Sequence, residues 1–142
     1  MTKIFAHRGA SAYAPENTME AFELAAKQGA DGIELDVHVT KDGEVVVTHD
    51  EKIERVSNGS GFVKDMTLRE LKRLSFHNHM ESYVGAGIPT LREVLEFVKT
   101  TTMAVNIELK TGLYWYPNIE EKTVAVSYTH LRAHETGASL VC

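Results

Sequence analysis

Residues 32–40 limit the fold of this chain more than any other segment, because apolar and polar side chains alternate through them without a break. The odd-numbered positions are all apolar: Ile33, Leu35, Val37 and Val39. The even-numbered positions from 34 onward are all polar: Glu34, Asp36, His38 and Thr40. Successive side chains of a strand point to opposite faces of its sheet. The segment therefore predicts a sheet with one packed face and one polar face that carries an acid pair.

Strands and helices alternate along the rest of the chain. Residues 3–7 and 103–110 also read as strands, and Glu108 and Lys110 share the polar face of the second one. Three polar residues, each followed three positions later by a glutamate, predict helix starts: Asn17, Thr67 and Thr90. The first helix is expected to end near Gly29. This alternation predicts a parallel α/β architecture.

A hairpin is expected after the alternating strand. Asp42-Gly43 is typical of a two-residue β-turn, and the chain then returns through residues 45–49. In that register Lys41 pairs with Glu44, and Asp36 faces His49 across the hairpin. The register predicts that His49 lies beside the acid pair.

Composition excludes several classes of protein. The chain has 142 residues, enough for one domain with a core, and its net charge of −5 argues against general nucleic-acid binding. Its single cysteine, Cys142, rules out an internal disulfide and a cysteine-based metal site. Neither a signal peptide nor a run of about 20 apolar residues is evident. We therefore expect a cytoplasmic protein.

Three carboxylates are the candidate metal ligands: Glu34, Asp36 and Glu108. An acidic strand face is common without a metal, so the first pair alone is weak support. Three clustered carboxylates repel one another, however, and a cation would relieve that repulsion. Ligation by oxygen alone favours Mg²⁺ or Ca²⁺ over zinc.

Histidine and arginine side chains adjoin these acids. His7 and Arg8 end the first strand, where sites collect in α/β folds, and an arginine fork suits a phosphate. The alternatives are a structural histidine and a solvated charge. His38 is a further candidate ligand whose role the sequence leaves open. The remaining four histidines are expected to be surface residues or to lie in a suspect tail: His77, His79, His130 and His134.

The order of the short motifs resembles that of the glycerophosphodiester phosphodiesterases from residue 3 to about 125. The matching motifs are His7-Arg8-Gly9, Pro15-Glu16-Asn17-Thr18, Glu34-Leu35-Asp36-Val37, His49-Asp50, Gly59-Ser60-Gly61, Ile88-Pro89-Thr90-Leu91 and Glu108-Leu109-Lys110. Each motif is short, but the ordered set is specific.

The resemblance implies a (β/α)₈ barrel and a metal-dependent hydrolase. Its reaction would cleave glycerophosphodiesters, small molecules such as deacylated phospholipids, to sn-glycerol 3-phosphate and an alcohol. Glu34, Asp36 and Glu108 would bind Ca²⁺ or Mg²⁺. His7 and His49 would be the base and the acid in that order. Arg8 and Lys110 would contact the phosphate, with Glu16 and Asn17 as supporting residues.

Length is the main departure from the resemblance. An eight-stranded barrel needs about twice the strands expected here, so residues 1–125 would form its N-terminal half. Residues 127–136 resemble an adapter-derived translation artefact seen in assembled sequence data, and we interpret residues 126–142 as a non-native tail without a strand. A half-barrel exposes a strand edge, so we expect this chain to have weak activity or none.

Two alternative functions remain at this point. One is a related barrel phosphodiesterase, such as a phosphatidylinositol-specific phospholipase C or a phospholipase-D-like enzyme. Those enzymes usually have apolar membrane-facing loops or an export signal, which the sequence does not show. The other is a non-catalytic fragment.

Overall fold

The computed structural model describes residues 2–110, 118–131 and 139–141. Its helices and strands follow in the order β1 (Phe5–His7), α1 (Met19–Lys27), β2 (Gly32–Val39), β3 (Val45–Val47), α2 (Leu68–Lys72), α3 (Leu91–Val98), β4 (Ala104–Leu109), α4 (Ile119–Leu131) and β5 (Ser139–Val141). Two short 3₁₀ helices, Val63–Asp65 and Glu81–Tyr83, lie between β3 and α3. The alternation of strands and helices that the sequence predicts is confirmed.

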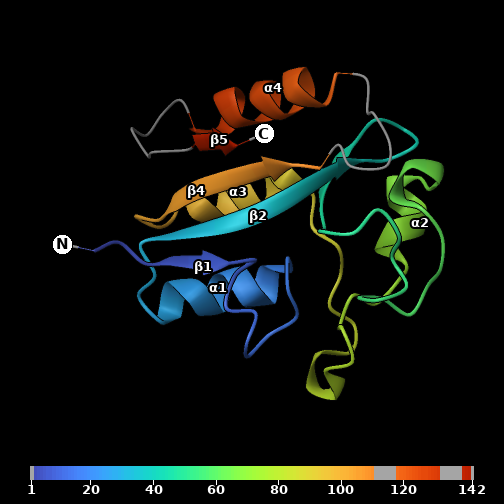
Figure 1. Cartoon of the computed structure of the whole chain (residues 1–142), viewed down its shortest axis with the longest axis horizontal. Helices are drawn as coiled ribbons and strands as arrows, with labels where there is room; N and C mark the ends of the chain where they lie inside the picture. Colours follow the sequence, from blue (N-terminus) through green and yellow to red (C-terminus); the bar gives the residue numbers. More distant parts are fainter. Residues whose placement is uncertain (1, 111–117, 132–138, 142) are drawn as a thin grey trace.

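One sheet organises the molecule, with its parallel strands in the order β1-β2-β4-β5 (Figure 1). β3 is the exception, because it runs antiparallel to the carboxyl end of β2. In the parallel register His7 pairs with Glu34, and Asp36 pairs with Glu108. The register alone therefore brings the three predicted carboxylates onto neighbouring positions of one face.

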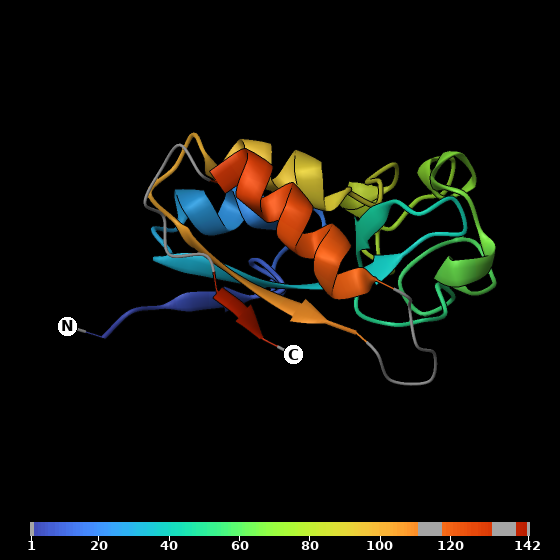
Figure 2. The same ribbon diagram turned by 90° about the horizontal axis from the view of Figure 1, so that it is seen from above.

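The two faces of the sheet differ as the alternation predicts. Figure 2 shows α1, α3 and α4 packed along one face. The apolar side chains of β2 and β4 lie on that side in a buried core: Ile33, Leu35, Val37, Val39, Val105, Ile107 and Leu109. Helix α3 contributes its buried stripe: Leu91, Val94, Leu95 and Val98. The polar side chains of both strands are left for the opposite face, which none of these three helices covers.

Two of the three predicted helix starts are confirmed, and the third is shifted by one residue. Thr67 and Thr90 form capping boxes with Glu70 and Glu93. At α1 the N-cap is Thr18, whose side chain accepts the N–H of Ala21, and not the predicted Asn17. The hydroxyl of Thr18 satisfies the open helix end, which leaves the side chain of Asn17 available for another partner.

The hairpin forms, but its predicted register is wrong by one residue. The N–H of Thr40 donates to the carbonyl of Glu44 at 2.9 Å, so the loop has three residues, 41–43. Gly43 has a φ of 86°, a left-handed conformation that three-residue hairpin loops favour. A one-residue slip exchanges the two faces of a strand. Asp36 therefore lies opposite Thr48, not His49, and the Thr48 N–H donates to the Asp36 carbonyl at 3.0 Å.

The segment between β3 and α3 forms a lobe beyond the carboxyl end of β2 (Figure 1). It has a core of its own that packs against Val46 of β3 and contains Ile53, Val56, Val63, Leu71, Phe76 and Ile88. Residues 75–87 are irregular apart from one 3₁₀ helix, as the sequence predicts. A separate core allows this lobe to hold the chain that follows His49 in place.

The carboxyl-terminal segment continues the alternation of strands and helices. Helix α4 runs past residue 126 to Leu131, and β5 pairs with β4 in parallel. The expectation that no strand follows residue 126 is therefore wrong, while the non-native origin of residues 126–142 stays a prediction. None of the helices in the described ranges combines the length and the apolar character needed to cross a bilayer.

Candidate active site

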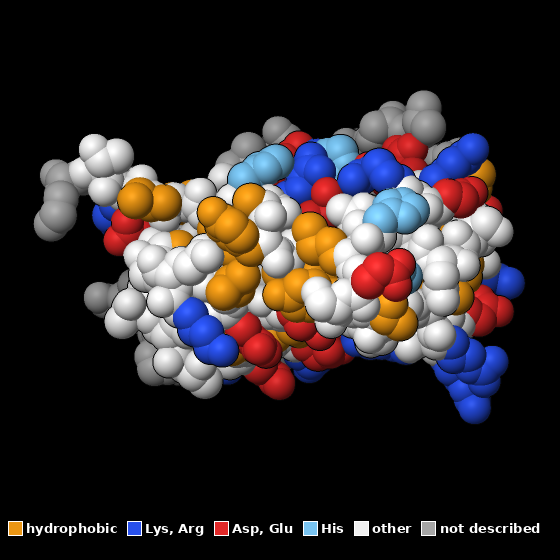
Figure 3. All heavy atoms as spheres, turned by 90° about the horizontal axis from the view of Figure 1, so that it is seen from below, with side chains coloured by type: hydrophobic (Ala, Val, Ile, Leu, Met, Phe, Trp, Pro, Cys, Tyr) orange, Lys and Arg blue, Asp and Glu red, His pale blue; other side chains and the backbone are white. Residues whose placement is uncertain are grey.

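The predicted site residues gather at the carboxyl ends of β1 and β4, at the middle of β2 beside them, and in the loops that follow β1 and β3. Backbone hydrogen bonds along one edge of β2 explain why these two loops meet there. The Arg8 N–H donates to the Glu34 carbonyl at 2.9 Å, and the Thr48 N–H donates to the Asp36 carbonyl on the same edge. Figure 3 shows histidine, basic and acidic side chains along one margin of the molecule, beside a band of hydrophobic side chains.

The three carboxylates converge as the sequence predicts. Glu34, Asp36 and Glu108 each offer an oxygen, and these oxygens lie within 4.8 Å of one another. The Asp36 side chain is 1% exposed and that of Glu34 is 13% exposed. One buried oxygen of each, Glu34 Oε1 and Asp36 Oδ1, has no hydrogen-bond partner among the described residues.

Burial and charge make this cluster unfavourable without a cation. Burial raises the pKa of the Glu34 carboxyl, and repulsion from Asp36 raises it further, to about 7. The N–H of Arg8 donates to Glu34 Oε2 at 3.2 Å and offsets only part of the shift. At neutral pH the folded protein thus holds a carboxyl that is only partly ionised.

The cluster fits a hard divalent cation. Two oxygens on one ion can be no farther apart than about 4 to 5 Å, twice the ordinary Mg–O or Ca–O distance. The separation within the cluster meets the upper end of that range, and Glu34 Oε1, which has no hydrogen-bond partner among the described residues, is an available ligand atom. Glu34, Asp36 and Glu108 would hold the ion, and the all-oxygen set suits Mg²⁺ or Ca²⁺.

The loop after β1 has an unusual backbone that directs Arg8 and Asn17 into the site. Arg8 and Asn17 have φ values of 58° and 56°, in the left-handed region that non-glycine residues rarely adopt. Gly9 has a φ of 81°, and a Cβ there would lie 2.8 Å from the backbone of Ala21. Strain of this kind collects at functional sites.

Asn17 supports Asp36 directly. Its buried side-chain amide donates to Asp36 Oδ2 at 2.9 Å, while its backbone N–H donates to the Arg8 carbonyl. Arg8 Nε lies 3.5 Å from the same Asp36 oxygen. Thr18 caps the helix instead, so Asn17 can orient a predicted metal ligand.

Lys110 lies among the carboxylates. Its ammonium donates to Glu108 Oε1 at 2.6 Å and lies 3.3 Å from Asp36 Oδ1. The hydrogen bond from Lys110 lowers the pKa of Glu108. The predicted phosphate-contacting side chain thus stands at the cluster, where it offsets negative charge.

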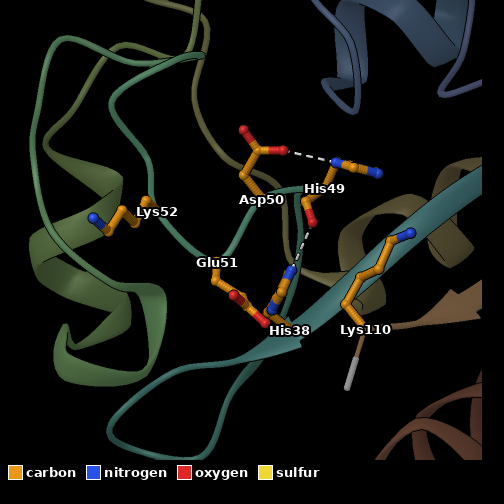
Figure 4. A pocket seen from close by; sticks show the side chains of 6 residues that line it. All are labelled: His38, His49, Asp50, Glu51, Lys52 and Lys110. Carbon is orange, nitrogen blue, oxygen red and sulfur yellow. Dashed lines mark hydrogen bonds and ion pairs between the residues drawn. The ribbon is translucent and has the colours of Figure 1, made fainter. Parts of the chain in front are cut away.

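His49 faces a pocket of about 370 Å³ that Lys110 also lines (Figure 4). Its Nδ1 lies 2.7 Å from Asp50 Oδ1. Since an ionised carboxylate only accepts hydrogen bonds, Nδ1 carries the proton and Nε2 is left for chemistry. In Figure 4 the side chain of Lys52 lies apart from this group.

His38 has a structural role. Its fully buried ring places Nε2 2.8 Å from the carbonyl oxygen of His49, and burial lowers its pKa. The neutral ring donates to that carbonyl and fixes the backbone that carries His49. His38 is not part of the carboxylate cluster.

His7 occupies the exposed side of the site. Its Nε2 lies 3.6 Å from Glu34 Oε2, and its side chain is 68% exposed. Among the remaining histidines, His77 contacts Ser75 Oγ through Nδ1 at 2.7 Å and His79 is exposed. The side chains of His130 and His134 lie outside the described residues.

Sequence reasoning missed Arg55. Its guanidinium contacts the carboxylates of both Asp50 and Glu16, and Glu16 also pairs with Arg8. No pattern marks this residue in the sequence, because residues 50–56 form a loop with no periodicity to fix where a side chain points.

The raised pKa of Glu34 gives a stability prediction. A carboxyl with a folded pKa of about 7 and an ordinary value of 4.5 binds its proton more tightly in the folded state. The free energy of unfolding of the metal-free protein should therefore fall as pH rises from about 4.5 through 7, by on the order of 1 to 3 kcal/mol. Denaturant unfolding in EDTA at a series of pH values measures this change.

Glu34→Gln is the matched variant for this measurement. It removes the titrating group, so its stability should change less with pH, and Mg²⁺ or Ca²⁺ should stabilise it less than the parent. Parallel stability curves for the parent and Glu34→Gln between pH 5 and 8 would contradict the prediction.

Fold and site together define the N-terminal part of an α/β barrel with a carboxylate, imidazole and guanidinium site at the carboxyl ends of its strands. A model of the glycerophosphoryl diester phosphodiesterase family matches residues 7–136. The chain therefore belongs to the glycerophosphoryl diester phosphodiesterase family.

Individual relatives agree with this assignment. The chain is 52% identical to a glycerophosphodiester phosphodiesterase of Caldanaerobacter subterraneus, over 87% of this chain and 51% of that protein. It is 56% identical to one of Bacillus altitudinis, over 86% of this chain and 51% of that protein. The chain thus spans about half the length of the curated relatives it matches.

Solved structures confirm the fold. A glycerophosphodiester phosphodiesterase of Agrobacterium tumefaciens superposes with a TM-score of 0.80 at 41% identity, covering 93% of this chain and 55% of that one. An Oleispira antarctica phosphodiesterase in complex with the product sn-glycerol-3-phosphate superposes with a TM-score of 0.82 at 35% identity, covering 99% and 56%. The predicted barrel fold, represented by about half its length, is confirmed.

Proposed function

We propose that this chain carries the metal-binding and acid–base residues of an enzyme that hydrolyses glycerophosphodiesters to sn-glycerol 3-phosphate and an alcohol. The observation that carries the proposal is the cluster of Glu34, buried Asp36 and Glu108, with His7 at the end of β1 and His49 in the loop after β3. Membership of the family and the sn-glycerol-3-phosphate complex of the Oleispira relative support this substrate class.

A Mg²⁺ or Ca²⁺ ion held by the three carboxylates would polarise a phosphoryl oxygen and orient the glycerol hydroxyls. The protein supplies the oxygens and keeps them in place: Asn17 holds Asp36, and the Arg8 N–H holds Glu34.

The two histidines divide the proton transfers. We assign His7 as the base that takes a proton from the attacking hydroxyl or water, and His49 as the acid that protonates the departing alkoxide. The exposed ring of His7 beside Glu34 can reach an incoming nucleophile. Asp50 keeps a proton on Nδ1 of His49, which leaves Nε2 as the nitrogen that transfers a proton to the alkoxide.

Cationic side chains stabilise the charge that develops on the phosphoryl group. Arg8 presents a guanidinium held at one end by Glu16, and Lys110 presents its ammonium at the pocket that it shares with His49. Fixed cations at such positions stabilise an anionic transition state more than the ground state.

The activity should be visible as cation-dependent release of sn-glycerol 3-phosphate from glycerophosphocholine by the product of the complete reading frame. A coupled glycerol-3-phosphate dehydrogenase assay measures it, and EDTA should abolish it reversibly. Absence of release with both Mg²⁺ and Ca²⁺ would reject the proposed function.

A further inference from the structure

Arg55 joins the two loops of the site through two carboxylates. Its Nε and Nη2 donate to the two oxygens of Asp50 at 2.7 and 3.1 Å. Its Nη2 and Nη1 donate to the two oxygens of Glu16 at 2.7 and 3.1 Å. One guanidinium thus forms forked contacts with acids that are 34 positions apart in the sequence.

Each of the two carboxylates also holds a residue of the proposed chemistry. Asp50 Oδ1 accepts from His49 Nδ1 at 2.7 Å as well as from Arg55. Glu16 Oε1 accepts from Arg8 Nη1 at 3.2 Å as well as from Arg55. A continuous series of polar contacts therefore links the proposed acid His49 to the proposed phosphate-contacting Arg8, with Arg55 at its centre.

Arg55 gives each of the two carboxylates a second partner. Without it, Glu16 would be balanced by Arg8 alone and Asp50 by His49 alone. The Arg55 hydrogen bonds keep the pKa of Asp50 at about 2. Burial opposes ionisation of Glu16, but its contacts with Arg55 and Arg8 outweigh that effect and lower its pKa.

We propose that Arg55 is a positioning residue that locks the imidazole of His49 and the guanidinium of Arg8 in a fixed relative placement through Asp50 and Glu16. The inference rests on the proposed function, since it gives a reason for holding these two groups together. Arg55 contacts both carboxylates and does not line the pocket, so its action reaches the site through them. The planar fork matters as much as the charge, because a lysine ammonium cannot contact four oxygens in this geometry.

The test follows the His49 ring directly. Long-range ¹H–¹⁵N spectra of the 142-residue chain report the Nδ1 proton of His49, assigned by its loss in His49→Gln. In Arg55→Ala this signal should be lost or strongly broadened by solvent exchange, while the fold persists by circular dichroism. Arg92→Ala, at an exposed position of α3, should leave the signal unchanged.

Arg55→Lys separates charge from geometry and is the variant to use if Arg55→Ala does not fold. It should retain only part of the protection of the His49 proton. A His49 signal identical to that of the parent in Arg55→Ala, or in Arg55→Lys where only that variant folds, would overturn the proposal.

Kinetics of the complete gene product give a second measurement. In Arg55→Ala, kcat should fall about 10- to 100-fold, the range found when a residue that orients a ligand is lost, and KM should change less than kcat. The spectra need no substrate, so the positioning role of Arg55 and the proposed function can be rejected independently of each other. An inactive parent would reject the proposed function, whereas an undisturbed His49 ring would reject the role of Arg55.

Discussion

Asp36→Asn should greatly weaken the binding of the divalent cation and, as a consequence, the rate of hydrolysis. Asp36 is the most buried of the three carboxylates; it lies opposite Glu108 in the sheet and two positions from Glu34 on the same strand. The amide removes one anionic ligand, so we expect Mg²⁺ or Ca²⁺ affinity to fall at least about 100-fold. Hydrolysis should fall about 10³-fold, the equivalent of about 4 kcal/mol of transition-state stabilisation.

Isothermal titration with each cation, followed by the coupled assay, checks this prediction. The fold should survive, because the amide of asparagine has nearly the same shape and removes the repulsion that raises the pKa of Glu34. Glu44→Gln is the control, since Glu44 is an exposed acid on the same hairpin. Equal cation affinity in Asp36→Asn and the parent would show that the cluster is not the metal site.

The sequence predicts the carboxylate cluster well because strand periodicity controls it. Alternation puts Glu34 and Asp36 on one face, and the same pattern in β4 puts Glu108 on the same side. In parallel neighbours, side chains of one face are adjacent once the register is known. Periodicity therefore gives the face of each carboxylate, and the pairing of β2 with β4 brings Glu108 beside Asp36.

Loops explain what the sequence does not predict. The register of the hairpin depends on whether its loop has two or three residues, and Asp42-Gly43 is compatible with both. Asn17 and Thr18 are both good N-caps, and only the tertiary partner Asp36 decides between them. Arg55 lies in a loop, where spacing in the sequence does not determine where a side chain points.

The hairpin register is the predicted reason for placing His49 beside the acid pair, and that reason is wrong. The two-residue turn predicts His49 opposite Asp36, but that position belongs to Thr48. His49 lies after the end of β3, where alternation no longer applies. Its place is set by the contact of His38 with its backbone and of Asp50 with its ring.

His49→Ala should have the second large effect, and its pH dependence should identify the role of this residue. A positioned general acid contributes about 10²- to 10⁴-fold to a rate, so kcat should fall within that range while cation binding is unchanged. The parent should show a bell-shaped pH profile between about pH 5 and 9, since one histidine must be neutral and the other protonated.

The pH–activity profiles of the two histidine variants distinguish the acid from the base, because each variant should lose the fall in activity on one side of the pH optimum. If His49 is the acid, its deprotonation causes the alkaline fall in activity, so the residual activity of His49→Ala should no longer decline on that side. His7→Ala should instead lose the acidic fall. His79→Asn, an exposed histidine whose φ of 63° asparagine tolerates, should behave as the parent does. A flat profile for the parent from pH 5 to 9 would reject the two-histidine scheme. Loss of the acidic side in His49→Ala would instead reverse the assignment of acid and base, because protonation of the base is what limits activity at low pH.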